Sequence, residues 1–186
     1  MKFCPDCGQP VSLKIPEGDH LERHVCTGCG AIHYHNPKII AGCVPELGSR
    51  ILLCKRAIEP RRGYWTIPAG FMENGEALQD AAARESMEEA LARVQIGSLL
   101  AIVNVLRAQQ VHIVFRAQLL DAAFGVGPES LEVGLYEESE IPWPEIAFMS
   151  VEFALRRFLA DRHAGLEQAH YRDIDWRDGA ALIRDR

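Results

Sequence analysis

A glycine loop that leads into a helix with clustered carboxylates, between Gly70 and Ala92, constrains this chain more than any other stretch. Residues 77–92 contain no glycine, proline or β-branched side chain, and Ala, Leu, Glu, Gln, Arg and Met dominate them, so intrinsic propensity predicts a helix. Asn74-Gly75 directly before it predicts the turn from which the helix starts. The rest of the chain must fold around this loop and helix.

The second half of the predicted helix gathers three acids. At about 100° and ~1.5 Å per residue, Glu85, Glu88 and Glu89 share roughly a third of the circumference, with Glu85 and Glu89 one turn apart. Such like charges repel one another, whereas a bound divalent cation reverses the sign of the interaction. Carboxylate oxygens suit Mg²⁺ or Mn²⁺, which also bind substrate phosphates. A solvated acidic face is the alternative interpretation of the same pattern.

The spacing of these acids resembles the box of the Nudix family, G-x5-E-x7-R-E-U-x-E-E-x-G-U, with U a bulky aliphatic residue. The positions that match its fixed residues are Gly70, Glu76, Arg84, Glu85, Glu88 and Glu89. Three positions depart from it, because Ser86 and Ala92 replace aliphatic residues and Leu91 replaces the late glycine. We expect these departures to affect how the helix ends and packs, more than its metal chemistry.

The resemblance implies a function and a set of roles. Nudix enzymes hydrolyse a nucleoside diphosphate linked to another moiety, on an α/β fold with a mixed sheet between helices, an α/β/α sandwich. By this resemblance the catalytic Mg²⁺ or Mn²⁺ is held by Glu85, Glu88, Glu89 and the carbonyl of Gly70, and Glu85 also helps to activate water. Glu76 and Arg84 form a supporting ion pair that fixes the loop.

A further acid is expected from a loop outside the box. We predict Glu129, which follows Gly127-Pro128, with Glu132 as the second candidate. An ordinary surface acid or a helix cap is the alternative role for both.

Four cysteines near the start form two C-x2-C pairs, Cys4/Cys7 and Cys26/Cys29, separated by 18 residues. This spacing predicts a tetrahedral Zn²⁺ site. Four thiolates leave no open position, so we expect the zinc to be structural. Disulfide pairing is the alternative, which a cytosolic compartment disfavours. The neighbouring histidines are expected to be surface or core residues: His20, His24, His33 and His35.

The remaining pattern predicts a zinc ribbon over residues 1–34, a Nudix domain over 35–165 and a polar, loosely docked tail over 166–186. Strands are predicted at 39–44 and 50–55, a short one at 65–70, a longer pair at 94–106 and 110–121, and another at 131–136. Ser150 is predicted to cap a second amphipathic helix that ends at Gly165.

Composition narrows the possible partners. The chain has 186 residues, 48% of them apolar, and a formal charge of −6, so it is predicted to be a poor nucleic-acid binder. No apolar run approaches the ~18 residues of a membrane span, and the three residues before Cys4 are too few for a signal peptide, so none is expected. We therefore expect a cytoplasmic protein, in the form of a homodimer, that acts on a small molecule.

Two branches of zinc-ribbon Nudix pyrophosphatases are similar to this chain. NADH pyrophosphatases carry an S-Q-P-W motif, whereas residues 139–144 read Ser-Glu-Ile-Pro-Trp-Pro here. The plant organellar FAD pyrophosphatase type is similar over nearly the full length to about residue 160, including residues 65–70 (WTIPAG) and 127–132 (GPESLE). We expect FAD, cleaved to FMN and AMP, or ADP-ribose as substrate, with NADH as the alternative.

Substrate contacts are predicted near the catalytic loop. Arg56 and Arg62 suit the phosphates, and Trp65 and Phe71 could stack on flat rings, although core packing is the alternative for each aromatic residue. A function of another class also stays open: a degenerate Nudix domain that binds a nucleotide or nucleic acid as a regulator without hydrolysing it.

Overall fold

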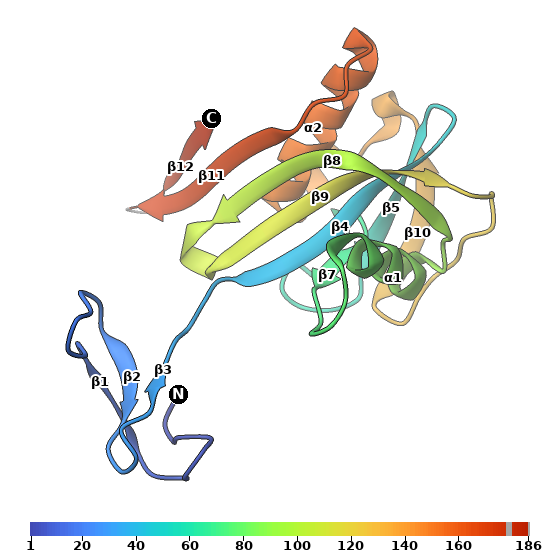
Figure 1. Cartoon of the computed structure of the whole chain (residues 1–186). Coiled ribbons are helices and arrows are strands. Elements are labelled where there is room, and N and C mark those ends of the chain that lie inside the picture. Colours follow the sequence, from blue (N-terminus) through green and yellow to red (C-terminus); the bar gives the residue numbers. More distant parts are fainter. Residues whose placement is uncertain (178–179, 186) are drawn as a thin grey trace. The chain divides into compact units, whose positions relative to one another are not determined.

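The computed structural model describes residues 1–177 and 180–185. The chain divides into two compact units, Met1–Pro37 and Lys38–Arg186 (Figure 1). The predicted boundary after residue 34 falls three residues before this division. Each unit has its own sheet, so each is described separately.

The first unit is a small ribbon of three antiparallel strands in the order β1-β2-β3. They span Val11–Lys14, Arg23–Cys26 and Ile32–His33. Its fully buried side chains are Cys4 and Cys26. Such a unit buries too little apolar surface to stay folded without a bound metal or a covalent cross-link, as expected for a metal-stabilised ribbon.

The second unit is built on a nine-stranded sheet in the order β10-β5-β4-β9-β8-β11-β12, with β6 beside β5 and β7 beside β4. The sheet is mixed, because β4 runs parallel to β9 and β8 parallel to β11 while the other pairs are antiparallel. The strands are β4 Lys38–Leu47, β5 Arg50–Arg56, β6 Trp65–Thr66, β7 Ala69–Phe71, β8 Val94–Val105, β9 Gln110–Leu119, β10 Ser130–Tyr136, β11 His170–Arg177 and β12 Ala180–Asp185.

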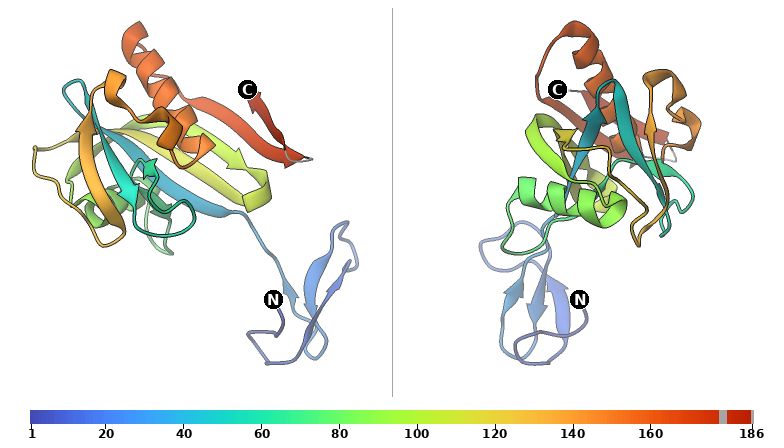
Figure 2. Two further views of the ribbon diagram at one scale, coloured as in Figure 1. Left: turned by 180° about the vertical axis from the view of Figure 1, so that it is seen from behind. Right: turned by 90° about the vertical axis from the view of Figure 1, so that its right-hand side faces the viewer.

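Helices α1 (Leu78–Ala90) and α2 (Met149–Ala164) lie on opposite faces of this sheet (Figures 1 and 2). The predicted α/β architecture is therefore present. Short 3-10 helices occupy Leu106–Ala108, Glu138–Glu140 and Trp143–Glu145. Among the described residues, no helix has the length and apolar character needed to cross a membrane.

The face of α1 that meets the sheet is made of small side chains. Ala81 and Ala82 are fully buried against Ala41 and Cys43 of β4, together with Phe115 of β9. Alanines let the helix backbone approach the sheet closely, which brings the acids of the helix beside the strands.

The end of α1 explains one departure from the box. Leu91 takes the position of the late glycine and adopts a left-handed backbone conformation with φ of 50°. Its N–H donates to the Met87 carbonyl at 3.0 Å, and the N–H of Ala92 donates to the Ser86 carbonyl at 3.2 Å. The helix thus ends as a glycine-terminated helix does, with a residue that pays a steric penalty for this conformation.

Replacing Leu91 with Gly is expected to raise the free energy of unfolding by ~0.5–1 kcal/mol. Relief of the left-handed strain contributes ~1–2 kcal/mol, and the greater flexibility of glycine in the unfolded chain offsets ~0.5–1 kcal/mol of it. Urea titration measures the difference. Leu91→Ala is the control, because it loses the same side chain and keeps the strain; equal stability of the two variants would contradict the interpretation.

Helix α2 covers the larger hydrophobic core on the other face of the sheet. Phe153, Ala154, Leu155 and Phe158 are buried there against Leu100 and other strand residues. The helix ends at Gly165 as predicted, with φ of 64°. The prediction that Ser150 caps it is wrong, because the residue before the first turn is Phe148 and Ser150 is buried inside the helix.

The predicted loose tail forms part of the sheet instead. Strand β11 pairs in parallel with β8, from His170 opposite Ala101 to Ile174 opposite Val105, and Ile174 is buried in the core. Charged residues alternate with few apolar ones along β11, so hydrophobic periodicity did not reveal the strand.

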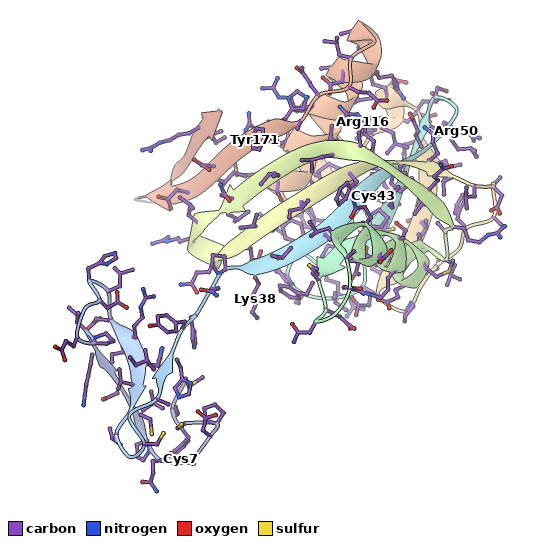
Figure 3. All side chains as sticks on the ribbon, viewed as in Figure 1. Cys7, Lys38, Cys43, Arg50, Arg116 and Tyr171 are labelled. Carbon is purple, nitrogen blue, oxygen red and sulfur yellow. The ribbon has the colours of Figure 1, made fainter. Side chains whose placement is uncertain are left out.

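A buried ionic network holds this strand to α2 and β9. Arg116 of β9 (labelled in Figure 3) donates to the Asp161 carboxylate and to the Gln168 carbonyl, and His170 Nε2 lies 2.9 Å from Asp161. Burial by itself raises the pKa of Asp161, but hydrogen bonds with His170 and Gln168 and the charge of Arg116 hold it below the ordinary value. The network adds ionic contacts to the apolar packing of Ile174 and so helps to fix β11 to the rest of the unit.

His112 on β9 gives the fold a pH dependence. Burial lowers the pKa of its imidazole to about 4, so the folded protein keeps it neutral. Its contribution to stability is therefore full above the ordinary pKa of 6.5 and is lost as pH falls toward 4. We expect His112→Gln to flatten this part of the stability curve in urea titrations, whereas His20→Gln, at a highly exposed position, leaves it unchanged. The same slope in both variants would contradict this assignment.

Candidate active site

Gly70 lies where strand β7 passes the carboxylates of α1. It pairs with Ala41 of β4, and a Cβ atom at Gly70 would lie 2.3 Å from Glu85 Oε1. Any side chain at this position would displace the Glu85 carboxylate. The first glycine of the box is thus required by close approach, which leaves the loop backbone directly beside the acid.

Arg84 connects the loop to the acids of the helix. Its guanidinium contacts Glu76 at 2.8 Å, Glu85 at 2.7 Å and Glu88 at 3.0 Å, and Nη2 also donates to the Phe71 carbonyl at 3.1 Å. The predicted Glu76–Arg84 ion pair is therefore present. It fixes the loop over residues 71–76 against the helix.

Glu85 and Glu89 are acids in a buried setting. They are 7% and 5% exposed, and burial raises the pKa of both, that of Glu89 to about 8. The backbone N–H of Ala69 donates to Glu89 Oε2 at 3.0 Å and orients it toward the loop. Glu88 lies more exposed at the rim. Two buried carboxylates with raised pKa values on one helix face form a site that a cation stabilises.

The segment from Gly125 to Gly127 brings Glu129 to this site. The N–H groups of Gly125 and Gly127 donate to the carbonyls of Ala90 and Glu89 at 2.8 and 3.1 Å, so the segment crosses the last turn of α1. A Cβ at Gly127 would lie 1.8 Å from the Glu88 carbonyl oxygen. In the sequence, the close approach of this segment to α1 is indicated only by Gly125 and Gly127, the two glycines that precede Glu129.

Glu129 follows this crossing, and its charge raises the pKa of Glu85 and Glu89 further. It therefore lies within electrostatic range of both. Glu132, the second candidate, is occupied elsewhere: it lies 3.6 Å from Lys55 Nζ across β5 and β10.

Three of the four predicted substrate contacts lie near the site or on the surface, and one is buried in the core. Arg56 acts on the buried acids, since its charge lowers the pKa of Glu89, while Arg62 is exposed in the loop that follows β5. Phe71 is 50% exposed beside Gly70, with Lys38 Nζ 5.0 Å from its ring centroid. The prediction for Trp65 is corrected, because it is 4% exposed and packs edge-on against Tyr136 in the core.

Ser86 makes a buried polar contact in place of an aliphatic one. Its hydroxyl donates to the Ala82 carbonyl at 3.0 Å and lies 3.2 Å from Cys43 Sγ, on the strand beside α1 (Figure 3). Burial raises the pKa of Cys43 to about 12, so the thiol is a packing group. A small polar pair thus replaces the bulky residue of the box and keeps the helix close to β4.

The four ribbon cysteines converge on one point. Their ligand atoms all lie within 4.8 Å of one another, with Cys4 and Cys29 sulfurs 3.8 Å apart and Cys7 and Cys26 sulfurs 3.4 Å apart. Sulfur atoms gather near Cys7 in Figure 3. Backbone N–H groups of Cys29 and Gly28 point at Cys26 Sγ and lower the pKa of that thiol, which favours the thiolate that zinc requires.

The two donor sets suit the metals that the sequence suggested, but the structure gathers them to different degrees. Among the described residues, no three box carboxylates have oxygens within 4.8 Å of one another, and the Arg84 guanidinium contacts Glu85 and Glu88. Four thiols at tetrahedral spacing suit Zn²⁺. The box offers carboxylates and a main-chain carbonyl, which suit Mg²⁺ or Mn²⁺, and Gly70 leaves the close approach to Glu85 that such a site needs. Hard and soft donors are thus separated between the two units.

Comparison with known families agrees with this architecture. The family model described as "NUDIX domain" matches residues 37–162, and the model described as "Nudix N-terminal" matches residues 2–35. Because the first covers more than half of the chain, the chain belongs to the Nudix hydrolase family, with an N-terminal zinc-ribbon domain.

Two relatives with similar sequences are both named NAD-capped RNA hydrolases. The chain is 31% identical over 144 residues to the NAD-capped RNA hydrolase NudC of Salmonella heidelberg (strain SL476), a match over 76% of this chain and 53% of that protein. It is 34% identical over 95 residues to the NAD-capped RNA hydrolase NUDT12 of Macaca fascicularis, over 47% of this chain and 20% of that protein. The chain thus spans about half the length of the NudC relative that it matches.

Solved structures confirm the fold. The crystal structure of a NUDIX hydrolase from Nitrosomonas europaea has a TM-score of 0.92 and 53% identity, covering 95% of this chain and all of that one. An ADP-ribose pyrophosphatase from Streptococcus suis 89-1591 has a TM-score of 0.59 at 19% identity, covering 74% and 99% of the two chains. This second similarity concerns the fold alone.

Proposed function

We propose that this protein hydrolyses the diphosphate bridge of a nucleoside diphosphate derivative, such as FAD, NADH or ADP-ribose, with the help of divalent cations. The observation that carries the proposal is the pair of buried carboxylates within electrostatic range of Glu129: Glu85, which lies against Gly70, and Glu89, which accepts from the Ala69 N–H. A domain that only binds nucleotides has no need for this costly arrangement.

The roles of the residues follow from their positions. Glu85, Glu88, Glu89 and the Gly70 carbonyl would hold Mg²⁺ or Mn²⁺. When bound, such cations polarise phosphoryl oxygens and lower the pKa of water. Glu129 is placed to accept a proton from the attacking water or to add a ligand. Arg84 and Glu76 hold the loop over residues 71–76 against α1. Arg56 and Arg62 offer positive charge to the phosphates.

The group attached to the adenosine diphosphate half of the substrate is either a nicotinamide nucleoside or a flavin in the two main candidates, NADH and FAD. The names of the relatives support a nicotinamide dinucleotide, the alternative of the sequence analysis, more than FAD. The flavin is supported by residues 139–144, which lack the S-Q-P-W order of NADH pyrophosphatases. The resemblance to the FAD pyrophosphatase type stays an expectation from the sequence, which the relatives described above do not confirm. FAD, NADH and ADP-ribose all contain an adenosine diphosphate half, so the proposal extends to that shared group.

Values of kcat/KM measured side by side with Mg²⁺ test the proposal. The panel is FAD, NADH, ADP-ribose, an NAD-capped RNA oligonucleotide and a nucleoside triphosphate. We expect at least one of FAD, NADH and ADP-ribose to exceed the triphosphate by tenfold or more, about 1.4 kcal/mol of transition-state discrimination. Tenfold preference for NADH over FAD would exclude the flavin, and preference for the RNA would overturn the expectation of a small-molecule substrate. Preference for the triphosphate would contradict the proposal.

The expected homodimer remains a prediction, which light scattering of the purified protein tests.

A further inference from the structure

His33 of the ribbon lies against the zinc-site cysteine Cys4. Its Nε2 atom is 3.3 Å from Cys4 Sγ, while Cys29 Sγ lies 3.8 Å from the same sulfur. The Asp6 carboxylate is 4.0 Å from that sulfur, and ligand atoms of Cys4, Asp6 and His33 all lie within 4.8 Å of one another. The sequence had indicated only an ordinary surface or core histidine.

The strand arrangement holds this imidazole in place. His33 is the second residue of β3 and pairs with His24 of β2, and it is partly buried. Cys4 is 2% exposed. The contact thus lies in a protected position and is fixed by backbone pairing.

We propose that His33 is a positioning residue of the zinc centre, which donates its Nε2–H to the Cys4 thiolate. A zinc-bound thiolate carries no proton, so the ring nitrogen has to be the donor in this 3.3 Å contact. Backbone N–H groups of Gly28 and Cys29 perform the same task for Cys26, each at 3.4 Å. His33 is the side-chain counterpart at the first cysteine pair.

This hydrogen bond has a measurable consequence. Four thiolates around one Zn²⁺ leave a net negative charge, and hydrogen bonds to sulfur stabilise it and orient the ligands. Loss of an outer partner of a metal ligand typically weakens metal affinity by about 10–100-fold. The inference rests on the ribbon holding one zinc ion and does not depend on which nucleotide the catalytic domain hydrolyses.

Zinc competition against a chromophoric chelator tests the inference on the full-length protein. We expect His33→Leu to weaken zinc affinity by about tenfold or more, and His33→Gln, whose amide N–H can take the place of Nε2–H, to stay close to wild type. His20→Leu is the matched control, because His20 lies in the same ribbon and its side chain is 88% exposed.

Cobalt substitution supplies a readout that a packing role would not move. The thiolate-to-Co²⁺ absorption band should shift in His33→Leu and return in His33→Gln. If His33→Leu does not fold, the band and affinity of His33→Gln still decide, because a packing role predicts that both differ from wild type. Unchanged zinc affinity in His33→Leu, equal losses in the Leu and Gln variants, or wild-type protein without zinc would each overturn the inference.

Discussion

Glu89→Gln is expected to lower turnover of the preferred substrate by at least ~100-fold, because a metal ligand and a negative charge are lost together. The variant should remain folded. Glutamine keeps an oxygen for the Ala69 N–H. Because burial raises the pKa of Glu89 to about 8, the side chain is largely uncharged near pH 7 without a metal, and the neutral amide replaces it without leaving an unpaired buried charge. Steady-state kinetics and urea titration on one preparation measure both expectations.

The control for this variant is Glu132→Gln, a carboxylate outside the cluster that pairs with Lys55. It should retain activity within a few-fold of wild type. A folded Glu89→Gln enzyme with full activity would remove the catalytic interpretation. It would favour the alternative function of a nucleotide-binding regulator, for which nucleotide binding without product formation is the direct evidence.

Asp161→Asn is expected to lower the free energy of unfolding by ~3–5 kcal/mol. This change leaves the buried guanidinium of Arg116 without its anionic partner, and breaking a buried ion pair on one side typically costs that much. Because His170 and Gln168 also contact Asp161, we expect β11 to lose protection in hydrogen exchange before the rest of the sheet.

Glu152→Gln provides the comparison for Asp161→Asn. Glu152 pairs with Arg156 one turn along the same helix, with both side chains exposed, so its loss should cost no more than ~0.5 kcal/mol. Similar losses in the two variants would show that the buried network does not hold the strand.

The catalytic loop and helix were predictable from sequence because their chemistry is local. The acids of the box, their spacing on one helix and the glycine before them fix the relation of Gly70 to Glu85 whatever the rest of the chain does. The zinc site was predictable for the same reason, because the spacing within and between the two C-x2-C pairs identifies its four cysteines.

Other features depend on contacts between distant segments. Trp65 looked like a stacking surface because it adjoins the catalytic loop, but Tyr136 from β10 packs against it. Strand β11 was missed because its anchor is ionic and involves Arg116, 54 residues before His170 in the sequence. The Ser86–Cys43 pair likewise joins a helix and a strand that sequence patterns cannot place in contact.

The metal dependence of hydrolysis, measured together with zinc content, tests directly whether the box carboxylates hold the catalytic cations. Protein treated mildly with EDTA should lose activity while it keeps one zinc ion, and Mg²⁺ alone should restore the activity, because hard carboxylates exchange Mg²⁺ freely and four thiolates retain Zn²⁺. We expect full recovery of activity with Mg²⁺ at constant zinc content. Recovery that requires Zn²⁺, or hydrolysis that persists without any divalent cation at the carboxylates, would contradict it.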